Sequence, residues 1–258
     1  MRVINVSCDG IFQAAERGLF DWLAGQEAEI ICLQDVRASI PEFEDSPQFQ
    51  LDGYFSYIFD AADSSQNGVA IYTRHAPKAI MYGFGLQSGE DMDGRYLQAD
   101  FDELSVVSVM VPHGPEESEQ FQAKTRFITG LQAHMEKITR KRRRYIFCGN
   151  WHMAATTGDV ENGDTHDSEP GSLASERQWF RQVYKDIGYA DAFRSSNTDT
   201  DEFSWWPSGT MGEGDGWRTD TQIISGSLVP QVEYAVIYKA REFSSHAPVI
   251  VDYDIGEL

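Results

Sequence analysis

The chain has 258 residues, of which 41% are hydrophobic, and a formal net charge of −20. This length and composition suit a folded protein with a sizeable core, and we expect a single domain over residues 1–258. No apolar run approaches the roughly 18 residues of a membrane span, and residues 1–10 lack a signal-peptide pattern, so we expect a cytoplasmic protein without membrane contact. The negative charge opposes binding of nucleic acid by the overall field.

Short apolar runs punctuated by Gly, Pro, Asp or Asn predict strands throughout the chain. In chain order these runs cover residues 3–4, 30–33, 69–72, 96–99, 106–109, 145–148, 222–224, 234–238 and 249–251. Helical periodicity predicts helices over 11–25, 119–138 and 173–187, with Gly188 as the stop of the last. Polar, glycine-rich composition predicts irregular structure over 154–172, 195–202 and 207–216. Many strands with few helices predict an α+β domain of packed sheets.

The three cysteines, Cys8, Cys32 and Cys148, each lie in or beside an apolar run. An odd number of cysteines in such positions predicts buried, reduced thiols.

The positive charges are concentrated in one place. Six of the 21 Lys and Arg residues fall within residues 137–144, namely Lys137, Arg140, Lys141, Arg142, Arg143 and Arg144. One interpretation is a solvated helix end, where cations suit the negative end of the helix dipole. The other is a local binding patch for phosphate or an acidic partner.

A series of short motifs follows or closes the predicted strands, at residues 7–10, 33–35, 67–70, 111–114, 149–152, 204–206, 216–220 and 245–248. This ordered series resembles the exonuclease III-like branch of the endonuclease/exonuclease/phosphatase superfamily over essentially the whole chain. The resemblance implies a four-layered α/β sandwich, with two mixed β-sheets face to face and helices outside. It also implies phosphodiester cleavage with Mg²⁺ or Mn²⁺, because a hard cation with oxygen ligands can position and neutralise the phosphate.

Three positions near the implied metal differ from the family pattern. Ser7 stands where the family has Asn, and Asp35 stands where the family has a metal-binding Glu. Met110 falls where the exonuclease III-like branch has a catalytic Tyr, so a hydroxyl is missing. If any cation binds, the resemblance makes Asp35 and Asp220 its ligands.

The implied catalytic motifs have changed as well. Asn150 replaces the Asp that orients the attacking water, and His152 replaces the Asn that follows it. Asp220 and His246 are retained, but Ser245 takes the place of a carboxylate that we expect to orient His246. Because losing the carboxylate behind a catalytic His costs about 10⁴ in rate elsewhere, these changes predict a pseudoenzyme with no catalytic residues, metal or cofactor.

A second resemblance lies within the degenerate members of this fold. Residues 33–38, 94–101, 140–149, 203–207, 216–223 and 246–254 resemble the catabolite repression control proteins of pseudomonads. That resemblance implies a non-catalytic regulator that binds RNA weakly or not at all alone, and represses translation with the RNA chaperone Hfq at A-rich mRNA sites. Arg140, Lys141, Arg142, Arg143 and Arg144 would then be the contact residues.

One departure from those proteins concerns a second arginine-rich stretch. The corresponding residues here are 228–233, and this segment, including Val229 to Glu233, carries no positive charge. Two alternatives therefore stay open: a Mg²⁺- or Mn²⁺-dependent nuclease or phosphodiesterase with an atypical site, and a protein-binding module that does not contact nucleic acid.

Overall fold

A computed structural model describes residues 1–85 and 92–256 and contains two mixed six-stranded sheets. The first sheet has the order β11-β12-β1-β2-β4-β3, from strands Val232–Ile237, Val249–Tyr253, Arg2–Ser7, Ile30–Gln34, Val69–Thr73 and Phe55–Phe59. The second has the order β5-β6-β7-β8-β10-β9, from strands Ala79–Tyr82, Tyr96–Asp100, Leu104–Met110, Arg144–Asn150, Asp220–Ser225 and Tyr189–Asp191. In each sheet the central pair, β1–β2 or β7–β8, is parallel and the other pairs are antiparallel.

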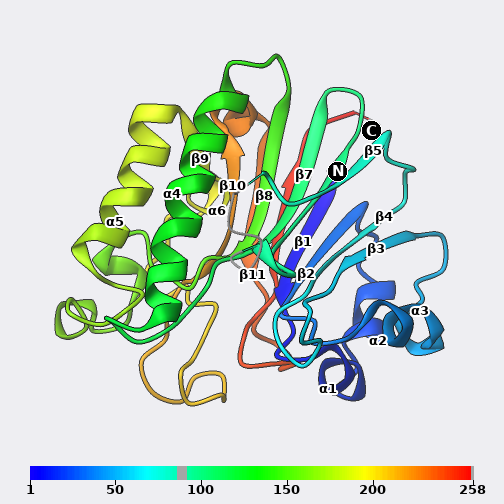
Figure 1. Cartoon of the computed structure of the whole chain (residues 1–258), viewed down its shortest axis with the longest axis horizontal. Helices are drawn as coiled ribbons and strands as arrows, with labels where there is room; N and C mark the ends of the chain where they lie inside the picture. The colour runs from blue at the N-terminus through cyan, green and yellow to red at the C-terminus, as the bar shows by residue number, and fades with distance from the viewer. Residues whose placement is uncertain (86–91, 257–258) are drawn as a thin grey trace.

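Helices cover the outer faces of both sheets (Figure 1). Helices α1 (Ile11–Glu16), α2 (Leu19–Ala24) and α3 (Ile40–Asp45) lie on the first sheet, and α4 (Glu119–Thr139) and α5 (Ala174–Arg181) lie on the second. A π-helical turn (Gln182–Ile187) continues α5, and α6 (Ala192–Ser196) follows β9. Short 3₁₀ segments lie at Pro47–Phe49, Thr157–Asp159, Gly163–Thr165 and Gly226–Gln231. The predicted sandwich is therefore confirmed.

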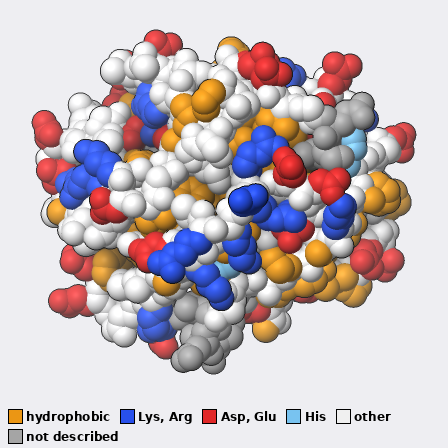
Figure 2. Space-filling view, turned by 90° about the horizontal axis from the view of Figure 1, so that it is seen from above, with side chains coloured by type: hydrophobic (Ala, Val, Ile, Leu, Met, Phe, Trp, Pro, Cys, Tyr) orange, Lys and Arg blue, Asp and Glu red, His pale blue; other side chains and the backbone are white. Residues whose placement is uncertain are grey.

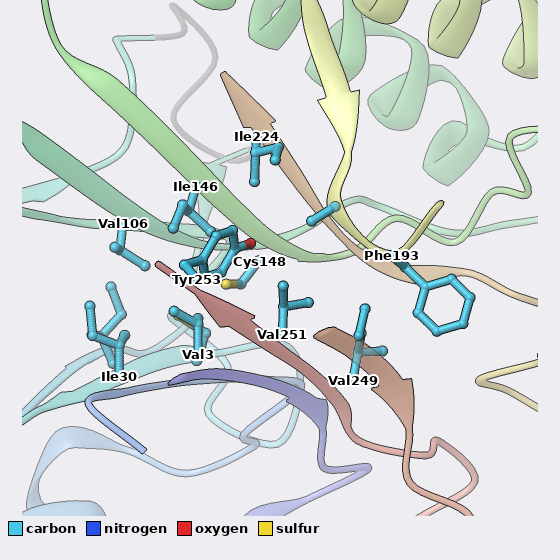
Figure 3. Close-up of a cluster of buried hydrophobic side chains, with 14 of the residues drawn as sticks. Val3, Ile30, Val106, Ile146, Cys148, Phe193, Ile224, Val249, Val251 and Tyr253 are labelled. Carbon is cyan, nitrogen blue, oxygen red and sulfur yellow. The ribbon is translucent and has the colours of Figure 1, made fainter. Parts of the chain in front are cut away.

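The two sheets share an apolar core. Figure 3 shows Val3, Ile30 and Val251 of the first sheet facing Val106 and Ile146 of the second. Because the central strands are covered by a sheet on one side and helices on the other, β2, β4 and β7 are buried along their whole length. The three cysteines, all within the described part of the chain, are buried and free, as predicted.

Three strands, the short helices α3 and α6 and one helix boundary were not predicted from the sequence. Strands β3, β5 and β9 are sheet edges that are partly exposed or only three residues long, so they lack a continuous apolar run. The predicted helix over 11–25 is two helices, because Gly18 adopts a left-handed φ of 83° between them. Among the described residues, no helix is long and apolar enough to cross a membrane.

Topology brings the motifs together. Both parallel pairs run so that their carboxyl ends, Ser7 beside Gln34 and Met110 beside Asn150, lie at one edge of the sandwich. Asp220 begins β10 opposite Asn150. Loops at the carboxyl ends of parallel strands are the usual place for a binding site in open α/β folds.

Candidate functional site

The two sheets are joined by polar side chains at this edge. The Asn150 amide donates to the Ser7 hydroxyl at 3.0 Å, and the Asn5 amide donates to the Gly149 carbonyl at 3.2 Å. Asn150 Oδ1 accepts the His152 backbone N–H at 3.2 Å. Asn150 therefore fastens one sheet to the other, but as an amide it cannot accept a proton from water.

His246 and Asp220 form a buried hydrogen-bonded pair within the site. The Nδ1 atom of His246 lies 2.8 Å from Asp220 Oδ2, which also accepts the Ser204 hydroxyl at 2.8 Å. Burial alone would lower the pKa of His246, but the carboxylates of Asp220, Asp9 and Asp35 raise it. The expectation that His246 has lost its orienting carboxylate is therefore wrong, since Asp220, at the start of β10 in the second sheet, lies against it.

The surroundings of this pair, in the part of the chain that the structure describes, hold the His246 ring and leave one oxygen of Asp220 unpaired. The Trp205 ring stacks on the His246 ring with centroids 6.0 Å apart, which fixes the plane of the imidazole. Asp220 is 1% exposed, and its Oδ1 has no hydrogen-bond partner among the described residues. A buried carboxylate oxygen of this kind usually accepts a hydrogen bond from a water molecule or from a donor on a ligand.

Asp9 is a site residue that sequence reasoning missed. Its Oδ2 accepts the Ser245 backbone N–H at 2.8 Å and the Ser245 hydroxyl at 2.5 Å. Burial would raise the pKa of Asp9, but the charge of His246 and the hydrogen bonds from Ser245 lower it. Position 245 carries no carboxylate of its own, but the Asp9 carboxylate, from the other end of the chain, contacts Ser245. The signal was present, because Asp9 stands only two residues after Ser7.

Asp35 is the position where the fold family implies a metal ion. Both of its oxygens are taken by Arg37, with Nε 3.0 Å from Oδ1 and Nη2 2.5 Å from Oδ2. The described residues contain no group of three or more His, Cys, Asp or Glu side chains arranged to hold a metal. The residues present therefore do not fit the implied cation at Asp35. Arg37, two residues after Asp35, was also missed as a site residue.

His152 and Met110 have definite structural roles. His152 Nδ1 contacts the Val111 carbonyl at 2.7 Å, and its ring lies 5.0 Å from that of His113. Burial and the charge of His113 lower the pKa of His152, which keeps it neutral near pH 7. Met110 is buried in the core between the sheets and so presents no polar group to the site.

The basic cluster lies at the other end of the molecule. Arg144 begins β8 and Asn150 ends it, which separates the cluster from the site by about 20 Å. Figure 2 looks onto the end of the sandwich away from α1, where Lys and Arg side chains gather among acidic ones. Arg143 donates to the carbonyls of Phe101 and Leu104, so part of the cluster supports the fold. A contact with nucleic acid by this cluster stays a prediction.

Comparison with known proteins gives concordant results. A family model described as "Endonuclease/Exonuclease/phosphatase family" matches residues 4–237. The exodeoxyribonuclease of Bacillus subtilis is 26% identical, covering 96% of this chain and 98% of that protein. Exodeoxyribonuclease III of Haemophilus influenzae is 28% identical, covering 98% of this chain and 100% of that protein. An AP endonuclease structure from Archaeoglobus fulgidus matches with a TM-score of 0.86 at 21% identity, covering 99% and 100% of the two chains.

These findings correct the functional prediction. The relatives are named as nucleases, which contradicts a non-catalytic translational regulator that acts with Hfq in catabolite repression. They also contradict the expectation of a pseudoenzyme, since nothing in them supports loss of activity. The alternative, a nuclease with an atypical site, fits them better.

Proposed function

We propose that this chain, which belongs to the endonuclease/exonuclease/phosphatase family, is a nuclease that hydrolyses phosphodiester bonds in DNA. The observation that carries the proposal is the buried His246–Asp220 pair at the shared edge of the two sheets. The names of the relatives, exodeoxyribonuclease and exodeoxyribonuclease III, support DNA as the substrate.

His246 can act on a phosphoryl oxygen directly. Its Nδ1 faces Asp220, so Nε2, on the opposite side of the ring, is the nitrogen left for a ligand. Because its pKa is raised, the ring carries a positive charge over more of the neutral range and can donate a charge-assisted hydrogen bond. Such a donor, held rigidly by Asp220 and Trp205, stabilises the charge that develops on the phosphoryl group.

The atypical residue is Asn150. An amide can hold the attacking water by hydrogen bonds but cannot take its proton. We therefore expect a slow enzyme, since general base catalysis is worth about 10²–10⁴ in rate.

Cleavage of labelled DNA tests the proposal. Duplexes with an abasic site, a 3′-phosphate or a blunt end are incubated with the protein in Mg²⁺, in Mn²⁺ and in EDTA, beside single-stranded RNA of the same length. We expect cleavage of at least one DNA substrate. Absence of cleavage under all three conditions would refute the proposal, and cleavage of RNA alone would refute the choice of substrate.

Two histidine variants control for contaminating nuclease. His246→Ala should lose about 10²-fold or more of the rate. His75→Ala is the matched control, because His75 lies just beyond the end of β4 that is remote from the site. Equal rates in the two variants would assign the activity to a contaminant.

A further inference from the structure

The Asp35–Arg37 pair occupies the place where the fold family implies a divalent cation. The guanidinium meets the carboxylate edge to edge through two hydrogen bonds, a planar fork that lysine cannot reproduce. The Asp35 side chain is 7% exposed and that of Arg37 is 43% exposed. The carboxylate is therefore covered, while the cation keeps an open face toward solvent.

The backbone around this pair is held from both sides. The N–H groups of Gly10 and Ile11 donate to the carbonyls of Asp35 and Val36, at 2.9 Å and 2.8 Å. On the other side, the Arg37 N–H donates to the Asn67 carbonyl at 2.8 Å.

Asp35 and Arg37 also adopt left-handed φ values of 52° and 51°. Such a conformation is costly for residues other than glycine and persists only where neighbouring structure fixes it. The fork is therefore pre-organised rather than a chance surface contact.

Arg37 has N–H groups that the hydrogen bonds to Asp35 do not use. The fork uses its Nε and Nη2, and within residues 1–85 and 92–256 its Nη1 has no protein partner. A guanidinium with a free edge is suited to the oxygens of a phosphate. The Asp35 carbonyl accepts the Gly10 N–H at 2.9 Å, and the neighbouring Asp9 carboxylate accepts the N–H of Ser245, the residue before His246, at 2.8 Å, so Arg37 and His246 lie at the same edge of the sandwich.

The charges of the site make such a cation necessary. The Asp220 carboxylate lies 2.8 Å from His246 Nδ1 and that of Asp9 binds the preceding Ser245, and together with Asp35 these negative charges would repel a phosphate. The metal that the fold family implies would relieve this repulsion, whereas here the Arg37 guanidinium neutralises Asp35.

We propose that Arg37 replaces the divalent cation, so that the site binds the phosphoryl group of DNA without metal. This inference rests on the proposed function for its ligand, a phosphate ester, but it concerns binding rather than cleavage. Its consequence is that a chelator leaves the affinity for phosphate-ended DNA unchanged.

Fluorescence anisotropy with a labelled duplex that ends in a 3′-phosphate measures this directly. We expect dissociation constants in EDTA and in Mg²⁺ to agree within about twofold, and Arg37→Ala to bind about tenfold more weakly or worse. Arg74→Ala, at the end of the first sheet remote from the site, is the matched control and should bind normally. Loss of binding in EDTA, or full binding by Arg37→Ala, would overturn the proposal.

Manganese binding gives a second readout that does not depend on DNA. In electron paramagnetic resonance, the unmodified protein should leave added Mn²⁺ free, because Arg37 holds both oxygens of Asp35. Uptake of Mn²⁺ by the unmodified protein at this site, abolished in Asp35→Asn, would refute the replacement. Circular dichroism confirms that each variant is folded, and Arg37→Lys, which keeps the charge without the fork, should bind DNA with intermediate affinity.

The two proposals fail separately. Metal-independent binding without any cleavage would refute the nuclease and leave the role of Arg37 standing. Cleavage and binding that both require Mg²⁺ would refute the role of Arg37 and leave the nuclease standing.

Discussion

Glu176→Gln tests how strongly the buried Lys124–Glu176 pair fixes the segment behind the site. Both side chains are nearly inaccessible, at 1% and 3% exposure. Glu176 Oε1 accepts from Lys124, and Oε2 accepts the backbone N–H groups of Gly171 and Leu173 at 2.7 Å and 3.0 Å. Lys124 also donates to the His152 carbonyl at 3.0 Å. One pair thus anchors both ends of the irregular segment 154–172.

The expected cost follows from leaving a buried ammonium without its counter-charge. Removing one partner of such a pair costs about 3–5 kcal/mol. For a chain of this size that corresponds to a fall of about 6–20 °C in Tm. Lys124→Met should cost a similar amount, because it leaves the carboxylate unpaired. The double variant should recover most of the loss, since two neutral side chains of similar volume remain.

Urea unfolding of the four proteins at pH 7, followed by fluorescence, measures the coupling between the two residues. We expect the double variant to be more stable than either single variant. If Glu176→Gln costs less than about 1 kcal/mol, or the two costs simply add, the pair does not anchor the segment as described.

Three further predictions concern the site and its support. Asn150→Asp restores a proton acceptor and should raise the DNA cleavage rate about 10²-fold; an unchanged rate would place the base elsewhere. Asp220→Asn should lower the free energy of unfolding most below pH 6.5. The raised pKa of His246 stabilises the folded protein at low pH, and this contribution is lost as the pH rises through the pKa of His246 in the folded state. An equal loss of stability to urea at pH 6 and pH 9 would contradict this. Gly94→Ala puts a Cβ 2.9 Å from two backbone nitrogens at a φ of 63° and should lower stability to urea by about 1–3 kcal/mol. Gly212→Ala, with open space around it, should cost less.

Sequence patterns predicted the buried centre of this fold well. Strands such as β2 and β7 are covered on both faces, so their apolar runs are continuous and easy to identify. The edge strands β3 and β5 have no such run, and their pairing is decided by neighbours far away in the sequence. Helix α4 was predicted because its apolar face repeats over 21 residues, whereas α1 and α2 are six residues each.

The site was predicted less well, because its partners are set by tertiary structure. The residue type at position 245 indicated that a carboxylate is absent there. It did not indicate that Asp9, 236 residues away in the sequence, contacts Ser245. In the same way, Asp220 contacts His246 only because β10 and the segment before β12 meet at one edge. Single positions therefore predicted too large a loss of catalytic activity, and the similarity to nucleases contradicts that prediction.

The position of β12 has a consequence for how the protein folds during synthesis. This strand, residues 249–253, lies between β11 and β1 and pairs with both. Strand β1 therefore lacks one of its two neighbours until residues 249–253 have been made, more than 240 residues later. At about 5–20 residues per second, the edge of β1 that pairs with β12 stays open on the order of ten seconds or more, whereas β2 gains its second neighbour with β4. An exposed strand edge is prone to wrong pairing, so a chaperone that shields it would act before residue 249 emerges.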